Sequence, residues 1–186
     1  MTPVLSNSVL LSPEEIANRV AEMGRQISKE YAGSAVTVIG ILKGSFIFVA
    51  DLIRRIDTGI PVEVDFISVG SYGDSVSSSG KVHIKKDIEV SVEGKNVILV
   101  EDIVDTGLTL TAVHDLLARR GAGSIRIATL LEKPESRQYA GHLDYVGFQI
   151  PSRFVVGYGL DFAQQYRNLP DIRILDAIGG ETGMTP

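Results

Sequence analysis

Apolar side chains recur every three or four positions between residues 13 and 31, a pattern that predicts a helix with one buried face. The residues on that face are Ile16, Val20, Met23, Ile27 and Tyr31. Ser12 and Glu15, with Pro13 between them, have the form of a capping box with proline at the first helical position. We therefore expect the helix to begin at Pro13, with Met23 and Tyr31 in the core of the protein.

Short apolar runs after this helix predict strands. The predicted strands span residues 35–42, 61–71, 81–85, 97–100, 124–131, 144–150, 153–159 and 172–175. Two more helices, over residues 46–56 and from Leu110 onward, follow the first and the fourth of these strands. Because helices follow strands that are apolar throughout, we expect an α/β fold, with a mostly parallel twisted sheet flanked by helices on both faces.

Composition narrows the class of protein. A chain of 186 residues that is 44% hydrophobic and 22% charged has the size and composition of one soluble globular domain. It has no apolar run near the length of about 20 residues that a membrane span needs, and residues 1–11 show no secretory signal. The absence of cysteine excludes disulfides and thiolate chemistry and is compatible with a reducing cytoplasm. We therefore expect a cytoplasmic protein without a membrane partner.

The net charge of −5 disfavours nonspecific binding to nucleic acid, which needs a basic surface. It also means that any polyanionic substrate must be held locally, by backbone amides, a few cations or a divalent metal. His83, His114 and His142 are isolated in the sequence and show no metal-ligand spacing. We expect no nucleic-acid partner and no histidine metal site.

The most informative stretch follows the strand predicted at residues 97–100. It consists of Glu101, Asp102, Ile103, Val104, Asp105, Thr106, Gly107, Leu108 and Thr109. In open α/β sheets, ligands bind beyond the carboxyl ends of the strands, where amides and the next helix N-terminus can hold an anion. Residues 106–109 therefore predict a phosphate-binding turn, in which Gly107 gives conformational freedom and the two threonines give extra donors. The spacing of a Walker loop is absent.

Two other predicted strand ends carry a lysine. Lys43 and Gly44 follow the strand at residues 35–42, and Lys133 follows the strand at residues 124–131, on the same edge as the acidic stretch. A solvated lysine in a plain turn is the alternative for each. Residues 70–80 are rich in glycine and serine, which is typical of a flexible hairpin tip.

Taken together, these motifs resemble the purine phosphoribosyltransferases, and among them the hypoxanthine-guanine branch. Residues 101–109 match the ribose-phosphate signature of that family, Glu-Asp-hydrophobic-hydrophobic-Asp-Thr/Ser-Gly-x-Thr, position for position. Leu42-Lys43-Gly44 is similar to its pyrophosphate-binding segment, and residues 154–161 are similar to its purine-binding segment. One departure is Leu108, where the family often carries a basic or polar residue. The resemblance extends over about residues 35–175.

The resemblance implies a magnesium-dependent transfer of the 5-phosphoribosyl group from phosphoribosyl pyrophosphate to a 6-oxopurine, in purine salvage. Asp105 would be the general base and Lys133 would donate to the purine 6-oxo group. Phe154 would stack on the base, Val155 would contact it through its backbone, and Asp161 would face the magnesium ion. The residues implied to bind phosphoribosyl pyrophosphate are Lys43, Gly44, Glu101, Asp102, Ile103, Val104, Asp105, Thr106, Gly107, Leu108, Thr109 and Arg167. Those implied for the metal are Glu101, Asp102 and Asp161.

The resemblance also implies a domain organisation. Residues 1–186 would form one domain, with a core over about residues 35–150 and a hood over about 151–186 to which the N-terminus contributes. Residues 71–80 would form a mobile lid carrying Ser71 and Tyr72. The assembly would be a homodimer or a homotetramer.

Two other functions remain open. An enzyme of the same fold acting on adenine, xanthine or a pyrimidine would keep the phosphate turn and change the base pocket; Lys133 and the Phe154-Val155 pair argue against it. A regulator of this fold would bind phosphoribosyl pyrophosphate or nucleic acid without catalysis. The acidic pI of about 5.2 and the presence of Asp105 argue against nucleic-acid binding by such a regulator.

Overall fold

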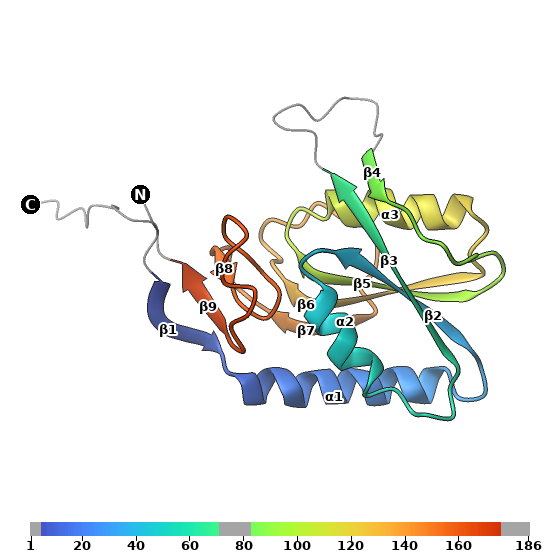
Figure 1. The fold of residues 1–186 in the computed structure, drawn as a ribbon, viewed down its shortest axis with the longest axis horizontal. Helices are drawn as coiled ribbons and strands as arrows, with labels where there is room; N and C mark the ends of the chain where they lie inside the picture. Colours follow the sequence, from blue (N-terminus) through green and yellow to red (C-terminus); the bar gives the residue numbers. More distant parts are fainter. Residues whose placement is uncertain (1–4, 71–82, 176–186) are drawn as a thin grey trace, which may run out of the picture.

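The computed structural model describes residues 5–70 and 83–175 of the chain. The predicted lid, with Ser71 and Tyr72, lies outside these residues, as does the start of the strand predicted at residue 81. Two sheets and three helices make up the described part (Figure 1).

The larger sheet has six strands in the order β4-β3-β2-β5-β6-β7. Their bounds are β2 Val36–Leu42, β3 Val62–Gly70, β4 His83–Lys86, β5 Asn96–Val104, β6 Ser124–Glu132 and β7 Tyr145–Gln149. The pairing of β3 with β4 is antiparallel and the other pairings are parallel. The side chains of the central strand β2 are buried up to Ile41, as its apolar run predicts.

Helices cover both faces of this sheet. Helices α1, Pro13–Glu30, and α2, Phe46–Ile53, pack in one hydrophobic core, and α3, Leu108–Arg119, packs in a second core on the opposite face (Figure 1). Helix α1 begins with the predicted capping box, in which the Ser12 amide donates to Glu15 Oε2 at 2.8 Å. Met23 and Tyr31 are buried. The predicted α/β fold with a mostly parallel, helix-flanked sheet is confirmed.

Three predicted boundaries were wrong. Strand β5 continues past residue 100 to Val104, because Ile103 and Val104 still pair with β6, so Glu101 and Asp102 lie on the strand rather than in a loop. Helix α3 begins at Leu108, two residues earlier than predicted, after Gly107 at a φ of 77°. Helix α2 ends at Ile53, after which i to i+3 hydrogen bonds lead the chain to residue 56 in turns.

A second sheet has three strands in the order β1-β9-β8 and is antiparallel. Strand β1, Leu5–Leu11, was not predicted from the sequence, whereas β9, Ile172–Leu175, was. Strand β8 has only two residues, Val155–Val156, although a strand was predicted over residues 153–159. The prediction was wrong because Gly157, Tyr158 and Gly159 adopt φ values of 103°, 48° and 101°, outside the β region.

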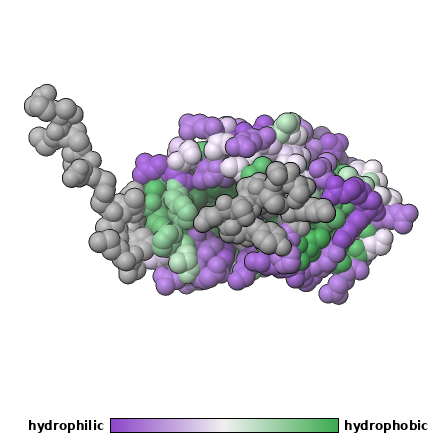
Figure 2. Space-filling model, turned by 90° about the horizontal axis from the view of Figure 1, so that it is seen from above, coloured by the Kyte–Doolittle hydropathy of each residue, from purple (hydrophilic) through white to green (hydrophobic). Residues whose placement is uncertain are grey.

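Hydrophilic side chains predominate on the face of the molecule shown in Figure 2, and hydrophobic ones form scattered patches. The large hydrophobic side chains exposed in the described part are Val9, Phe46, Leu108, Phe154 and Phe162. Two of them, Phe154 and Phe162, pack against each other with ring centroids 5.8 Å apart. Phe154 also lines a cavity between the two sheets, where the predicted site residues meet.

Candidate active site

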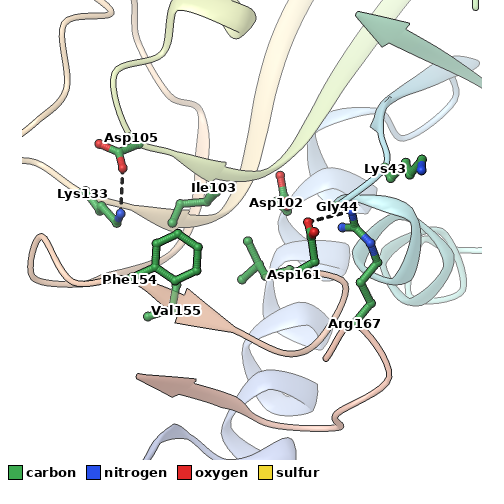
Figure 3. A pocket seen from close by; sticks show the side chains of 11 residues that line it. Lys43, Gly44, Asp102, Ile103, Asp105, Lys133, Phe154, Val155, Asp161 and Arg167 are labelled. Carbon is green, nitrogen blue, oxygen red and sulfur yellow. Dashed lines mark hydrogen bonds and ion pairs between the residues drawn. The ribbon is translucent and has the colours of Figure 1, made fainter. Parts of the chain in front are cut away.

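A cavity of about 340 Å³ opens between the carboxyl ends of strands β2, β5 and β6 and the chain around β8 (Figure 3). Its lining residues are Lys43, Gly44, Asp102, Ile103, Asp105, Lys133, Phe154, Val155, Leu160, Asp161 and Arg167. The structure thus brings together residues that are more than a hundred positions apart in the chain. Leu160 is the member of this lining that the sequence motifs did not single out.

A smaller cavity of about 130 Å³ adjoins the first one. It is lined by Glu101, Ile103, Val104, Asp105, Thr106, Gly107, Leu108, Thr109 and Leu110. Ile103 and Asp105 line both cavities, so the two cavities meet at the end of β5. This arrangement suits a ligand with an anionic group in the smaller cavity, against the N-terminus of α3, and its remainder in the larger one.

Asp105 follows β5 directly and both of its carboxylate oxygens accept hydrogen bonds. Lys133 Nζ donates to Oδ2 at 2.7 Å, and the Ser136 hydroxyl donates to Oδ1 (Figure 3 shows the bond from Lys133). The hydrogen bond from Lys133 and then that from Ser136 hold the pKa of Asp105 below its ordinary value. Asp105 is therefore a charged carboxylate placed at the cavity beside a strong donor.

Lys133 is only 8% exposed, which is unusual for a lysine. Its backbone amide donates to the carbonyl of Val104 at 2.9 Å and so extends the pairing of β5 with β6 by one residue. This backbone hydrogen bond fixes the position of the Lys133 Cα atom, from which the side chain extends. The alternative of a solvated lysine is excluded by its burial and by its ion pair with Asp105.

Glu101 and Asp102 are adjacent carboxyls on β5, of which Asp102 is buried and Glu101 is partly buried. Burial raises the pKa of both groups, and the neighbouring Asp102 raises that of Glu101 further. No described residue gives Glu101 Oε2, a buried atom, a hydrogen bond. Two adjacent acids of which one buried oxygen lacks a partner favour a cation or a ligand hydroxyl at this place.

Gly44 makes room for Asp102. A Cβ atom at this position would lie 1.6 Å from Asp102 Oδ2, so no other residue fits here without moving the carboxylate. The Leu42-Lys43 peptide bond just before it is cis. The turn after β2 therefore lies directly against the second acid of β5.

The two cations at the other side of the cavity, Lys43 and Arg167, share one acceptor. Gln164 Oε1 accepts from Lys43 Nζ at 3.2 Å and from Arg167 Nη2 at 3.3 Å. Arg167 also forms an ion pair of 2.6 Å with Asp161 and donates to the carbonyl of Gly159 at 2.6 Å. The predicted pair Asp161 and Arg167 is thus brought together, whereas Gln164 was missed because no motif marks it.

Phe154 lies at the cavity and not in a core. The residue is 51% exposed and lines the cavity (Figure 3), and its ring lies at 84° to that of Phe162. The next residue, Val155, is buried and pairs with Ile174 of β9. An exposed aromatic ring at a cavity, on a residue next to a strand, suits the stacking of a flat ring.

The three residues predicted to surround the metal do not form a cluster. Asp102 and Asp161 line the larger cavity, and Glu101 lines the smaller one. Within residues 5–70 and 83–175, no group of three His, Cys, Asp or Glu side chains is arranged to hold a metal ion by itself. A metal at this site would therefore take part of its ligands from the substrate or from water.

None of the helices in the described ranges is long and apolar enough to span a membrane.

Comparisons with known proteins identify relatives of this chain. The model of the phosphoribosyl transferase domain matches residues 6–163. The hypoxanthine-guanine phosphoribosyltransferase of Bacillus subtilis (strain 168) is 50% identical over 167 residues, which cover 90% of this chain and 92% of that protein. The bifunctional protein TilS/HprT of Listeria innocua is also 50% identical over 167 residues, but these make up only 26% of its length.

Solved structures give the same result. A crystal structure of a hypoxanthine-guanine phosphoribosyltransferase from Bacillus anthracis, with a HEPES molecule in its active site, matches with a TM-score of 0.87 at 46% identity. The match covers 93% of this chain and 100% of that chain. The similarity therefore includes both sheets as well as the motifs around the cavity.

Proposed function

The chain belongs to the phosphoribosyl transferase family, and from that premise we propose that it acts as a hypoxanthine-guanine phosphoribosyltransferase. It transfers the 5-phosphoribosyl group from phosphoribosyl pyrophosphate to hypoxanthine or guanine. The products are the purine nucleoside monophosphate and pyrophosphate, as purine salvage requires. Two relatives that this chain matches over nearly their whole length carry that name.

The observation that carries this proposal is the pair of Asp105 and Lys133 at the cavity, 2.7 Å apart. A 6-oxopurine presents its O6 and N7 atoms side by side on one edge. Lys133 is a pure donor and pairs with O6, whereas the charged Asp105 accepts a proton from N7. The two groups thus read and activate the same edge of the base, while Phe154 stacks on its face and the Val155 backbone contacts its rim.

The reaction forms one bond and breaks another at the ribose C1 atom. N9 of the purine bonds to C1 as the bond from C1 to the pyrophosphate oxygen breaks, and the N7 proton passes to Asp105. Because C1 becomes cation-like, catalysis consists largely of placement and charge stabilisation. Residues 106–109 hold the 5-phosphate through backbone amides and threonine hydroxyls, Leu108 by its backbone alone. Lys43, Gly44 and Arg167 hold the pyrophosphate. Ile103 and Val104 form the wall between the 5-phosphate and the pyrophosphate.

Magnesium fits the donor set at this site. Glu101 and Asp102 are carboxyls that hold the ribose hydroxyls and through them one metal, and the unpartnered Glu101 Oε2 supports this role. Asp161 would face a magnesium ion through a bridging water. The metal, when bound, neutralises the diphosphate charge that a chain of net charge −5 would otherwise repel.

The domain organisation belongs to the same proposal. The chain is one domain in which the small sheet forms the hood, whereas the lid implied for residues 71–80 lies outside the described residues. It works in the cytoplasm as a homodimer or homotetramer, without nucleic acid as partner.

The test is the release of pyrophosphate when the protein meets hypoxanthine, phosphoribosyl pyrophosphate and magnesium. We expect turnover with hypoxanthine and guanine, little with adenine, and none in excess chelator. Omission of the purine is the control for simple hydrolysis of the donor. Binding of the donor without turnover on any purine would contradict the proposal and favour a regulator, and full activity in excess chelator would contradict the role of magnesium.

A further inference from the structure

Ser136 contacts Asp105 although no motif of the sequence marks it. Its hydroxyl donates to Asp105 Oδ1, while Lys133 donates to Oδ2 of the same carboxylate. Each oxygen therefore has its own donor, one neutral and one charged. Ser136 lies in the turn that follows β6, and its amide donates to the carbonyl of Lys133 at 3.3 Å.

The chain around Ser136 is docked on the turn after β5. We call residues 133–139 the clamp segment. The amides of Gln138 and Tyr139 both donate to the carbonyl of Thr106, at 2.9 and 3.1 Å. A Cβ atom on Gly107 would lie 2.5 Å from the Tyr139 Cβ, which shows how closely the clamp segment approaches. The position of the Ser136 hydroxyl is therefore fixed by backbone contacts that do not involve its own side chain.

The two donors to Asp105 differ in what they do once a purine is bound. In the proposed function, Lys133 turns its ammonium group to the purine O6 and so leaves Asp105 Oδ2. The Ser136 hydroxyl has no such second partner and stays on Oδ1. A carboxylate held at one oxygen presents the other in a fixed direction, and a donor to the charged form keeps it charged.

We propose that Ser136 is a positioning residue for the general base: it holds Oδ1 of Asp105 so that Oδ2 accepts the N7 proton. This rests on the proposed function. Ser136 touches neither substrate, and it acts only through Asp105. It is also absent from the lining of either cavity, in keeping with a supporting position.

The experiment is a double-mutant cycle with Ser136→Ala and Asp105→Ala, which isolates the term that two residues share. In the wild-type background, Ser136→Ala is expected to lower kcat roughly 10- to 100-fold, the range for a hydrogen bond to a charged group. The KM for phosphoribosyl pyrophosphate should change less than about twofold, because the clamp segment keeps its backbone contacts. In the Asp105→Ala background, the same change should have almost no effect on kcat.

Two further variants complete the design. Ser136→Thr keeps the hydroxyl and should restore kcat to within a few-fold of wild type. Ser91→Ala is the matched control, since its hydroxyl accepts from the Glu93 amide in a turn and lines neither cavity. Its kcat should equal that of wild type.

The outcomes separate the inference from the function it rests on. An active wild type with an unchanged Ser136→Ala variant, or an equal loss in both backgrounds, would overturn the role of Ser136 and leave the proposed function standing. An inactive wild type would overturn the proposed function itself.

Discussion

The two sheets place their site residues by different means. In the larger sheet, strands β5 and β6 pair in parallel with one constant register over their whole length, and Asp102, Asp105 and Lys133 lie at or just beyond their ends. In the smaller sheet, the pairing of β1 with β9 is irregular and β8 has two residues. The residues that this region supplies, Phe154, Asp161 and Arg167, lie mostly in the loop after β8. In the proposed function, the regular pairing of β5 and β6 fixes the position of the reacting groups, and the loop after β8 supplies contacts to the base and the pyrophosphate.

The loop region depends on a few contacts for its position. The Tyr158 hydroxyl donates to Asp51 Oδ2 of α2 at 2.6 Å, and burial raises the pKa of Tyr158 above its ordinary value. A Cβ on Gly159 would lie 2.1 Å from the carbonyl oxygen of Gly44, so this glycine is needed for the close approach of the loop to the turn after β2. Ala163, Gln164 and Tyr166 have positive φ values of 49°, 65° and 73°, a conformation that costs energy in residues with side chains. Tertiary contacts must hold this loop.

The largest effect is expected from a change at Asp105, which directly follows strand β5 of the larger sheet. Asp105→Asn keeps the shape of the side chain but cannot take a proton, so kcat should fall roughly 100- to 10,000-fold. The variant should still fold, but its thermal midpoint should fall, because the amide leaves the buried ammonium of Lys133 without an opposite charge. A variant with wild-type kcat would show that Asp105 is not the base.

A smaller effect is expected from the contact that holds the loop. Tyr158→Phe removes its hydrogen bond to Asp51 and should lower stability by about 1–2 kcal/mol. Because that contact positions the loop, the KM values for both substrates should rise by a few-fold while kcat changes little. Steady-state kinetics with both substrates measure this.

The matched control for Tyr158 is Tyr145→Phe. Tyr145 is a buried tyrosine on β7 whose hydroxyl donates to Glu30 on α1, away from either cavity. It should lose similar stability with unchanged KM values. Equal KM effects in the two variants would contradict the idea that the loop depends on its own anchor.

The smallest effect on activity is expected from a change at Asp65, a partly buried residue on strand β3 of the larger sheet. Burial alone would raise the pKa of Asp65, but hydrogen bonds from the amides of Phe66, Glu89 and Val90 and from Lys86 lower it to about 2. A carboxyl with a lowered pKa stabilises the fold above its unfolded value near 4, and this stability is lost as the pH falls from about 4 toward 2. The contribution is at most about 2.5 kcal/mol.

Asp65→Asn tests this contribution. The variant should be less stable than wild type at pH 7 and should lose less stability between pH 5 and pH 2.5, while its kinetics at pH 7 remain unchanged. Denaturant unfolding at several pH values gives both free energies. Parallel pH dependences in the two proteins would show that Asp65 does not supply the difference.

The sequence predicted those parts of the site that are local in the chain. Residues 101–109 form one continuous strand end, turn and helix start, and Lys133 and Lys43 follow apolar runs, so periodicity located all three on one edge of the sheet. Strand β5 was predicted too short because its acids interrupt the apolar run, although the pairing with β6 carries it through Glu101 and Asp102.

What the sequence did not predict depends on contacts between distant segments. Strand β1 contains polar residues without alternation and is a strand only because β9 pairs with it. Ser136 and Gln164 lie in polar turns, and nothing local distinguishes them from solvated residues. Only the docking of these turns on Asp105, Lys43 and Arg167 shows their place in the site.

The central claim is that Lys133 and Asp105 read the O6 and N7 edge of the purine. Adenine carries a 6-amino donor in place of O6, so it leaves Lys133 unpaired. Sites built on such hydrogen bonds reject the mismatched analogue by as much as about 10,000-fold. The measurement is kcat/KM for hypoxanthine and for adenine, with wild type and with Lys133→Met. We expect a large hypoxanthine-to-adenine ratio in wild type and a ratio at least about 100-fold smaller in the variant; an unchanged ratio would contradict the claim, because the base would then be recognised elsewhere.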